Sequence, residues 1–127
     1  MGILSVLIAA AAGWVFGAVW YGIVGKKWMI VAGLTEETIN RKNYVAFVGS
    51  FICAILVAGM MRHIFAGSGV DTLRDGFVSG LGLGVFIATP WIATNYLFAQ
   101  RPAALTLYDG VYASGASAVM GTMLVLI

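Results

Sequence analysis

Charge is the scarcest property of this sequence. Only 9% of the 127 residues are Asp, Glu, Lys or Arg, against about 25% in an average soluble domain. Hydrophobic residues make up 61% of the chain, and a soluble monomer of this composition would expose more apolar surface than such proteins tolerate. The composition therefore excludes an ordinary water-soluble fold. It predicts a lipid-embedded protein with a single domain over residues 1–127.

Cysteine, histidine and basic tracts are also scarce. Cys53 has no second cysteine to form an internal disulfide and no metal-ligating neighbours, so it is expected to act as a small hydrophobe. His63, the only histidine, follows Arg62 at the end of an apolar run and is expected to be solvated. Neither a Ser–His–acid set nor a pair of catalytic carboxylates is visible, which predicts no enzyme, cofactor or metal site. A net charge of +2 without a basic tract excludes nucleic-acid binding.

Long apolar stretches are abundant. An α-helix needs about 20 apolar residues to cross a bilayer core, and stretches near this length lie at residues 3–25, 44–61 (extending to 66 at most), 76–99 and 103–127. The first stretch has no basic region before it and is longer than the apolar part of a secretory signal, so it is expected to be retained. The predicted fold class is all-α, a membrane bundle of four transmembrane helices.

The longest polar segment, residues 26–43, connects the first two spans. Gly33 is expected to end a short interfacial piece. Thr35 is expected to cap a helix that continues into the second span, because Glu36 and Glu37 would place negative charge in its first turn.

The other two connections are shorter. In the second, residues 67–69 are expected to form a turn and Asp71 to cap the helix that follows. In the third, Pro102 suits the first turn of the last helix, where its missing N–H costs nothing.

The orientation is predicted from the basic residues. The first and third connections carry five of them, and the second carries Arg62 and Arg74. Because short cytoplasmic loops are enriched in Lys and Arg, the first and third loops are predicted to be cytoplasmic and both termini outside. The expected location is the bacterial cytoplasmic membrane. The five basic residues are Lys26, Lys27, Arg41, Lys42 and Arg101.

Small residues recur at helical spacing in every span. Such stripes let membrane helices approach closely, and they serve either packing within the chain, the favoured interpretation, or an interface with another chain. A nucleotide loop at Gly80–Gly84 is excluded because no strand precedes it. The predicted packing residues are Gly13, Gly17, Gly76, Gly80, Gly84, Gly110 and Ser114.

Asp109 is the most unusual residue, because a charged side chain inside a bilayer is costly without a partner, proton or water. Tyr21, Asn95 and Arg101 are its candidate partners, all near the same membrane face. The favoured interpretation is structural: Asp109 is paired or neutral and holds the last helix in register. The other is a cytoplasm-facing polar cavity with Asp109 as a proton or cation site. Pro90 is expected to kink the third span beside this cluster.

Several short blocks of sequence carry a resemblance to a known family. The blocks are Gly17-Ala18-Val19-Trp20-Tyr21, Gly25-Lys26-Lys27-Trp28-Met29, Ala32-Gly33-Leu34-Thr35-Glu36-Glu37, Thr94-Asn95-Tyr96-Leu97-Phe98 and Arg101-Pro102. With these blocks the chain resembles a largely bacterial membrane family, domain of unknown function 1761. The resemblance implies a short four-helix membrane protein and brings no activity with it.

The sequence thus leaves two functional hypotheses. The first is a structural or interaction protein of the membrane, either a homo-oligomer or an accessory subunit of a larger membrane complex. The alternative is a small dimeric transporter or channel that uses Asp109. The expected partners are the lipid bilayer and other membrane protein chains.

Overall fold

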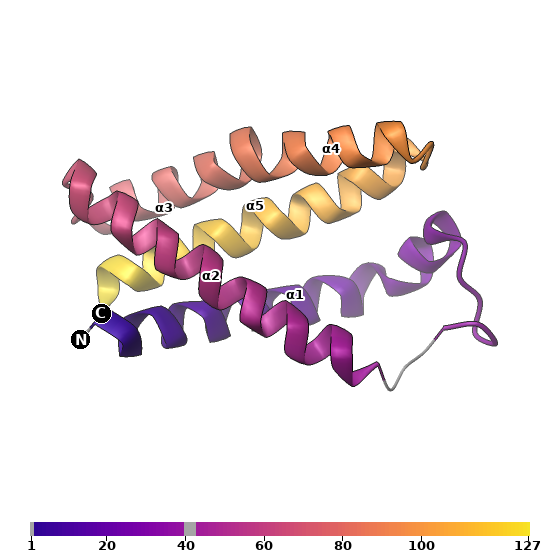
Figure 1. Cartoon of the computed structure of the whole chain (residues 1–127), viewed down its shortest axis with the longest axis horizontal. Helices are drawn as coiled ribbons and strands as arrows, with labels where there is room; N and C mark the ends of the chain where they lie inside the picture. Colours follow the sequence, from indigo (N-terminus) through magenta and orange to yellow (C-terminus); the bar gives the residue numbers. More distant parts are fainter. Residues whose placement is uncertain (1, 40–42) are drawn as a thin grey trace.

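The computed structural model describes residues 2–39 and 43–127, and all its regular structure is helical (Figure 1). The all-α class predicted from the sequence is confirmed over this part of the chain. Three of the elements, α3, η1 and α4, follow one another directly and form one continuous helical rod of 26 residues, which we call the third rod because it follows α1 and α2. The elements are α1 (Gly2–Ala32), α2 (Tyr44–Ser68), α3 (Leu73–Leu83), the π-helical turn η1 (Gly84–Ala88), α4 (Thr89–Phe98) and α5 (Ala103–Leu126).

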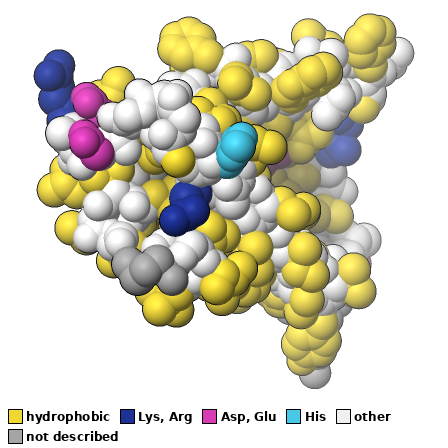
Figure 2. Space-filling view, turned by 60° about the vertical axis from the view of Figure 1, so that its left-hand side comes forward, with side chains coloured by type: hydrophobic (Ala, Val, Ile, Leu, Met, Phe, Trp, Pro, Cys, Tyr) yellow, Lys and Arg dark blue, Asp and Glu magenta, His cyan; other side chains and the backbone are white. Residues whose placement is uncertain are grey.

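Three helices in the described residues are long and apolar enough to cross a membrane. They are α1, α2 and the rod Leu73–Phe98. Hydrophobic side chains accordingly cover much of the surface seen in Figure 2, where charged ones are few. The fourth helix, α5, has 24 residues but is less apolar than the other three.

The helices form an arrangement centred on α5. This helix contacts α1 on one side and α3, η1 and α4 on the other, while α2 packs mainly against α1. Both chain ends and the α2–α3 connection lie at one end of the molecule, and the α1–α2 and α4–α5 connections lie at the other (Figure 1). Because α2 crosses α1 obliquely, the arrangement is more open than the compact bundle expected from the sequence.

Glycines allow α5 to lie against the backbone of the third rod. A β-carbon on Gly80 would stand 2.3 Å from the carbonyl oxygen of Ser117, and one on Gly76 would stand 2.7 Å from that of Gly121. Gly84 is equally close to the backbone of Ser114. Real β-carbons do not come so near to backbone atoms, so only glycine permits this approach. The Gly76, Gly80 and Gly84 face is therefore used within the chain.

The core of buried side chains lies toward the end of the molecule that holds the termini. It joins α1, α2 and α5 through Val6, Ala9, Ala10, Ala54, Ala58, Met61, Phe65 and Met120. The first seven residues of α2, from Tyr44 to Ser50, contribute nothing to it, and six of them are exposed. Only 17% of the most apolar window of α2 is buried. The N-terminal half of α2 therefore diverges from the other helices.

The α1–α2 connection differs from its sequence-based prediction. α1 does not stop at residue 25 but continues to Ala32, and Gly33 then leaves the helix with φ +79°. The extension is possible because Lys26 and Lys27 are exposed and do not interrupt the apolar face. The predicted helix from Thr35 is wrong over the described residues, since residues 36–38 form a turn. Its continuation through 40–42 lies outside the described residues.

Side-chain caps set the other helix boundaries. Asn43 caps α2 by accepting a 3.1 Å hydrogen bond from the Ala46 amide. α2 runs beyond residues 61 and 66 to Ser68, so the turn predicted at 67–69 begins only at Gly69, with φ +72°. Thr72, and not Asp71, caps α3. This cap starts the third rod at Leu73 rather than 76.

The last two predicted spans also shift slightly. The third rod ends at Phe98 rather than 99, and α5 ends at Leu126 rather than 127. Pro102 stands at the cap position just before α5 and not within its first turn. Its extended backbone, with ψ of 144°, turns the chain into the helix.

The irregularity predicted at Pro90 takes the form of the π turn η1, directly before α4. The amide of Thr89 reaches back to the carbonyl of Gly84, five residues earlier, and the Thr89 hydroxyl donates to the same oxygen at 2.7 Å. After the proline, Thr94 donates its hydroxyl to the Pro90 carbonyl at 2.9 Å. A π turn holds one more residue than an α turn. The side chains after it are therefore rotated about the helix axis relative to their positions in an uninterrupted α-helix.

Candidate functional site

Asp109 joins three helices. Its carboxylate lies on α5, and its Oδ1 accepts a 2.5 Å hydrogen bond from the Tyr21 hydroxyl of α1. The Tyr96 hydroxyl of α4 donates to its Oδ2. We call Asp109, Tyr21 and Tyr96 the Asp109 clamp.

The clamp supplies two hydrogen-bond donors to a half-buried carboxylate. Both hydrogen bonds are partly buried, and each carboxylate oxygen takes one phenol donor. Hydrogen bonds to a charged acceptor are stronger than neutral ones, and they offset part of the cost of removing the carboxylate from water. The geometry therefore suits a role in tying α1, α4 and α5 together.

Aromatic side chains surround the Tyr21 member of the clamp. Its ring lies edge-on to Trp28, with centroids 5.7 Å apart, and 5.4 Å from Tyr112 of α5. Gly17 leaves room for Tyr112, because a β-carbon there would stand 2.4 Å from its ring. One helical turn from the contact between Gly17 and Tyr112, the Trp20 indole donates to the Tyr108 carbonyl at 2.9 Å. These contacts fix the α1–α5 register at the clamp.

The remaining predicted packing residues, Gly13, Gly110 and Ser114, lie where α5 contacts α1 or α4. Gly13 faces Met120 of α5, and a β-carbon there would stand 2.7 Å from its Cγ. Gly110 faces the Thr89 methyl group at 2.8 Å by the same measure. The hydroxyl groups of Thr89 and Ser114 lie 3.3 Å apart, which adds a polar contact between α4 and α5.

Of the four residues proposed for the polar cluster, the structure brings together Tyr21 and Asp109. Tyr21 lies on Asp109, but Asn95 is exposed on α4 and its neighbour Tyr96 occupies the place beside the carboxylate. The Arg101 guanidinium donates instead to the Ala32 carbonyl at 2.7 Å. That bond satisfies the C-terminal end of α1 and ties it to the α4–α5 connection.

The π turn explains why Tyr96 and not Asn95 faces α5. Four-residue spacing from Gly76 through Gly80 and Gly84 would bring residue 88 and later 95 to this face. Because η1 adds one residue, Thr89 takes the place of 88, and Tyr96 follows two turns later. The sequence offered only the small-residue stripe and Pro90 as signals, and the extra residue that brings Tyr96 to this face is visible only in the structure.

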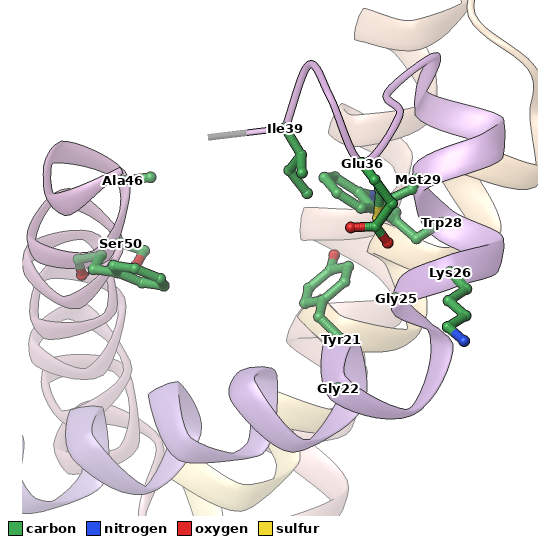
Figure 3. A pocket seen from close by; sticks show the side chains of 11 residues that line it. Tyr21, Gly22, Gly25, Lys26, Trp28, Met29, Glu36, Ile39, Ala46 and Ser50 are labelled. Carbon is green, nitrogen blue, oxygen red and sulfur yellow. The ribbon is translucent and has the colours of Figure 1, made fainter. Parts of the chain in front are cut away.

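A cavity opens between α1, the α1–α2 connection and the diverging half of α2. It has a volume of about 580 Å³, and its lining includes Tyr21, Trp28, Glu36, Phe47 and Ser50. Figure 3 shows Glu36 and Ile39 of the connection above Tyr21, facing Ala46 and Ser50 of α2 across the space.

A second cavity of about 300 Å³ adjoins the first. The two share Tyr21, Phe47 and Ser50, and the second continues along α1 to Trp14. At that depth α1 and α2 are joined again, because the Trp14 indole donates to the Ser50 hydroxyl at 3.0 Å. We call the two cavities together the α1–α2 crevice.

The described residues contain no group of three or more His, Cys, Asp or Glu side chains that could hold a metal ion. The carboxylate of Asp109 instead has phenols as its partners. The chemistry visible at this site is hydrogen bonding between helices.

Comparison with known proteins identifies the family. The model of a family described as "Protein of unknown function (DUF1761)" matches residues 4–125. The chain belongs to the DUF1761 family. The resemblance inferred from the sequence blocks is therefore confirmed, over nearly the whole chain. No curated protein and no solved structure matches it. The Asp109 clamp and the α1–α2 crevice both lie inside the segment that defines this DUF1761 match.

Proposed function

We propose that this DUF1761 protein is a structural or interaction protein of the membrane. It crosses the bilayer four times and associates with other membrane chains, either as a homo-oligomer or as an accessory subunit of a larger membrane complex. In this proposal the Asp109 carboxylate serves architecture and not catalysis.

The fourth crossing in this proposal is α5. Its 24 residues rise about 36 Å at 1.5 Å each, which exceeds a bilayer core of about 30 Å. α5 packs between α1 and the third rod, and its glycine, serine and threonine residues are buried or half-buried. A helix in this position needs fewer apolar residues than one that faces lipid.

The proposed location is the bacterial cytoplasmic membrane, with the α1–α2 and α4–α5 connections in the cytoplasm and both termini outside. Two observations support this orientation. The two connections lie at the same end of the molecule (Figure 1), and five of the seven Lys and Arg residues lie in these connections or in the last two turns of α1.

The observation that carries the functional proposal is that each oxygen of the Asp109 carboxylate accepts a hydrogen bond from a tyrosine of another helix, Tyr21 or Tyr96. The carboxylate is used to hold three helices together. At the same time the apolar windows of α2 and of the third rod are each only 17% buried. These helices offer long faces to lipid or to a neighbouring chain.

Purification in mild detergent at native expression tests the proposal. The expected result is recovery of the chain with stoichiometric larger membrane proteins or as a homo-oligomer. Asp109→Asn should leave this association unchanged, because Asn keeps a hydrogen-bonding side chain at the clamp. Recovery as a monomer without partners contradicts the proposal.

The second candidate function is a small dimeric transporter or channel. It is favoured by one observation: Tyr21 lines the 580 Å³ cavity and also donates to Asp109, so one hydrogen bond separates the carboxylate from that space. Reconstitution in liposomes tests it. A proton-coupled flux that Asp109→Asn abolishes would support the transporter and count against a purely structural role.

A further inference from the structure

We propose that a cleft between α2 and the third rod binds a lipid-soluble molecule that carries a carbonyl group on an otherwise apolar body. This ligand site goes beyond the proposed structural role, and it shares no lining residue with the α1–α2 crevice. The cleft has a volume of about 460 Å³, within the range of small-molecule sites. All the residues that line it belong to the described part of the chain. We call it the α2–rod cleft.

The walls of the α2–rod cleft are aliphatic. One wall includes Val57, Met60 and Met61 of α2, and the other includes Leu83 and Ile87 of the third rod. Methionine side chains adapt to irregular shapes, and the rod wall includes part of the π turn η1, an irregularity that is frequent at functional sites. None of the lining residues is charged. The cleft therefore suits an uncharged, apolar molecule.

One polar side chain lies where the cleft reaches α5. Ser117 lines the cavity and is only 6% exposed, and its hydroxyl has no hydrogen-bond partner among the described residues. Neighbouring hydroxyls on α5 differ, because Thr122 donates to the Ala118 carbonyl at 2.9 Å and Ser114 lies 3.3 Å from the Thr89 hydroxyl. A buried donor without an acceptor is unfavourable. A carbonyl oxygen on a molecule in the cleft supplies that acceptor.

The depth of Ser117 distinguishes this molecule from the surrounding phospholipid. Within α5, Ser117 lies about 21 Å of helix from Ala103 and about 14 Å from Leu126. It is therefore near the middle of a bilayer core about 30 Å thick. The ester carbonyls of phospholipids lie at the edges of that core, and their acyl chains carry no acceptor. The carbonyl must belong to a molecule that dissolves in the hydrocarbon itself.

Photolabelling of the full chain in nanodiscs tests the proposal. The probe is benzophenone, an apolar ketone whose photoexcited carbonyl reacts with nearby C–H bonds. The expected result is saturable labelling at Met60 and Met61, which line the cleft. Fluorenone should compete at a concentration about fivefold lower than fluorene, in which a methylene replaces the carbonyl. This difference is in the range for one neutral hydrogen bond.

A serine variant tests the role of the hydroxyl. Ser117→Ala should bring the competing concentrations of fluorenone and fluorene within twofold of each other and leave that of fluorene unchanged, because only the hydrogen bond is lost. Ser79→Ala is the matched control, since Ser79 is half-buried and does not line the cleft. The fivefold difference should persist in this control.

A second pair of variants tests the location of the site. Val57→Trp fills the cleft and should abolish saturable labelling. Val48→Trp adds the same side chain at an exposed position of α2 that does not line the cleft, and labelling should persist. Far-ultraviolet circular dichroism establishes that both variants are folded.

Three results would overturn the proposal. The first is labelling of the wild-type chain that does not saturate. The second is equal competition by fluorenone and fluorene, which indicates that hydrocarbon chains alone occupy the cleft. The third is occupation by a second copy, seen as cross-linking of Val57→Cys chains in a Cys53→Ala background with no saturable labelling.

Discussion

Tyr96 and Asp109 face each other across the α4–α5 hairpin, with the tyrosine hydroxyl donating to the carboxylate. Tyr21 approaches the same carboxylate from α1. The Asp109 carboxylate, which would be energetically costly in lipid without partners, thereby fixes three helices relative to one another.

Removal of either phenol hydroxyl should destabilise the protein. Tyr21→Phe and Tyr96→Phe each leave one carboxylate oxygen without its donor. The expected loss is about 1–2 kcal/mol of unfolding free energy per variant, within the range for hydrogen bonds to charged groups and for bonds inside membranes. Denaturant titration in detergent measures it. Tyr44→Phe, the same change at a residue 69% exposed, should change stability by less than about 0.5 kcal/mol.

The third rod should tolerate a methyl group at Gly82 but not at Gly80. Gly80→Ala places a β-carbon 2.3 Å from the Ser117 carbonyl oxygen, a backbone atom, so α3 and α5 must separate. We expect a loss of about 1–3 kcal/mol. A β-carbon at Gly82 meets nothing within 4 Å, and Gly82→Ala should be neutral or stabilising, because alanine favours helix more than glycine does. Equal melting temperatures for the two variants would contradict the packing described here.

The register of α4 can be tested with two single-residue deletions in a Pro90→Ala background. Deletion of Ile87 should convert the π turn to an α turn and leave Tyr96 on Asp109, because it removes only the extra residue. Deletion of Trp91 lies beyond the turn and rotates Tyr96 away by about 100°. Both side chains are exposed, so loss of burial is not the difference. Only the first variant should still lose stability on Tyr96→Phe.

The helical fold and part of the Asp109 clamp could be predicted from the sequence. Composition and apolar runs are sufficient for an all-helical membrane protein, because both follow from the cost of exposing backbone polar groups and charge to lipid. Asp109 and Tyr21 are also recognisable, the first as an isolated charge and the second by its place near the same membrane face.

Other features depend on tertiary structure. Asn95 was expected at the clamp because it is a polar residue near the same membrane face as Asp109, but the π turn η1 directs Tyr96 to that place instead. The divergence of α2, which creates the α1–α2 crevice, leaves no trace in its hydrophobic pattern, because a membrane helix is apolar whether it faces protein or lipid. Arg101 was proposed as a partner of Asp109 from its charge and its place near the same membrane face, whereas its guanidinium donates to the Ala32 carbonyl at the end of α1.

The proposed orientation predicts which positions react from each side of the membrane. In a Cys53→Ala background, needed because Cys53 is exposed, single cysteines are placed at Glu37 and at Ser68. Both positions are exposed, at opposite ends of the molecule. An impermeant maleimide applied to intact cells should label the cysteine at position 68 and spare that at position 37. Labelling of both only after lysis, or the reverse pattern, contradicts the orientation.

A double-mutant cycle between Tyr96 and Asp109 tests the central claim, that the carboxylate is a structural tie between helices. Unfolding free energies are measured in one detergent for the wild type, Tyr96→Phe, Asp109→Ala and the double variant. The account predicts a coupling energy of about 1 kcal/mol or more, because the second substitution costs little once its partner is gone. Additive losses, with a coupling energy near zero, would show that the two side chains do not stabilise the fold together.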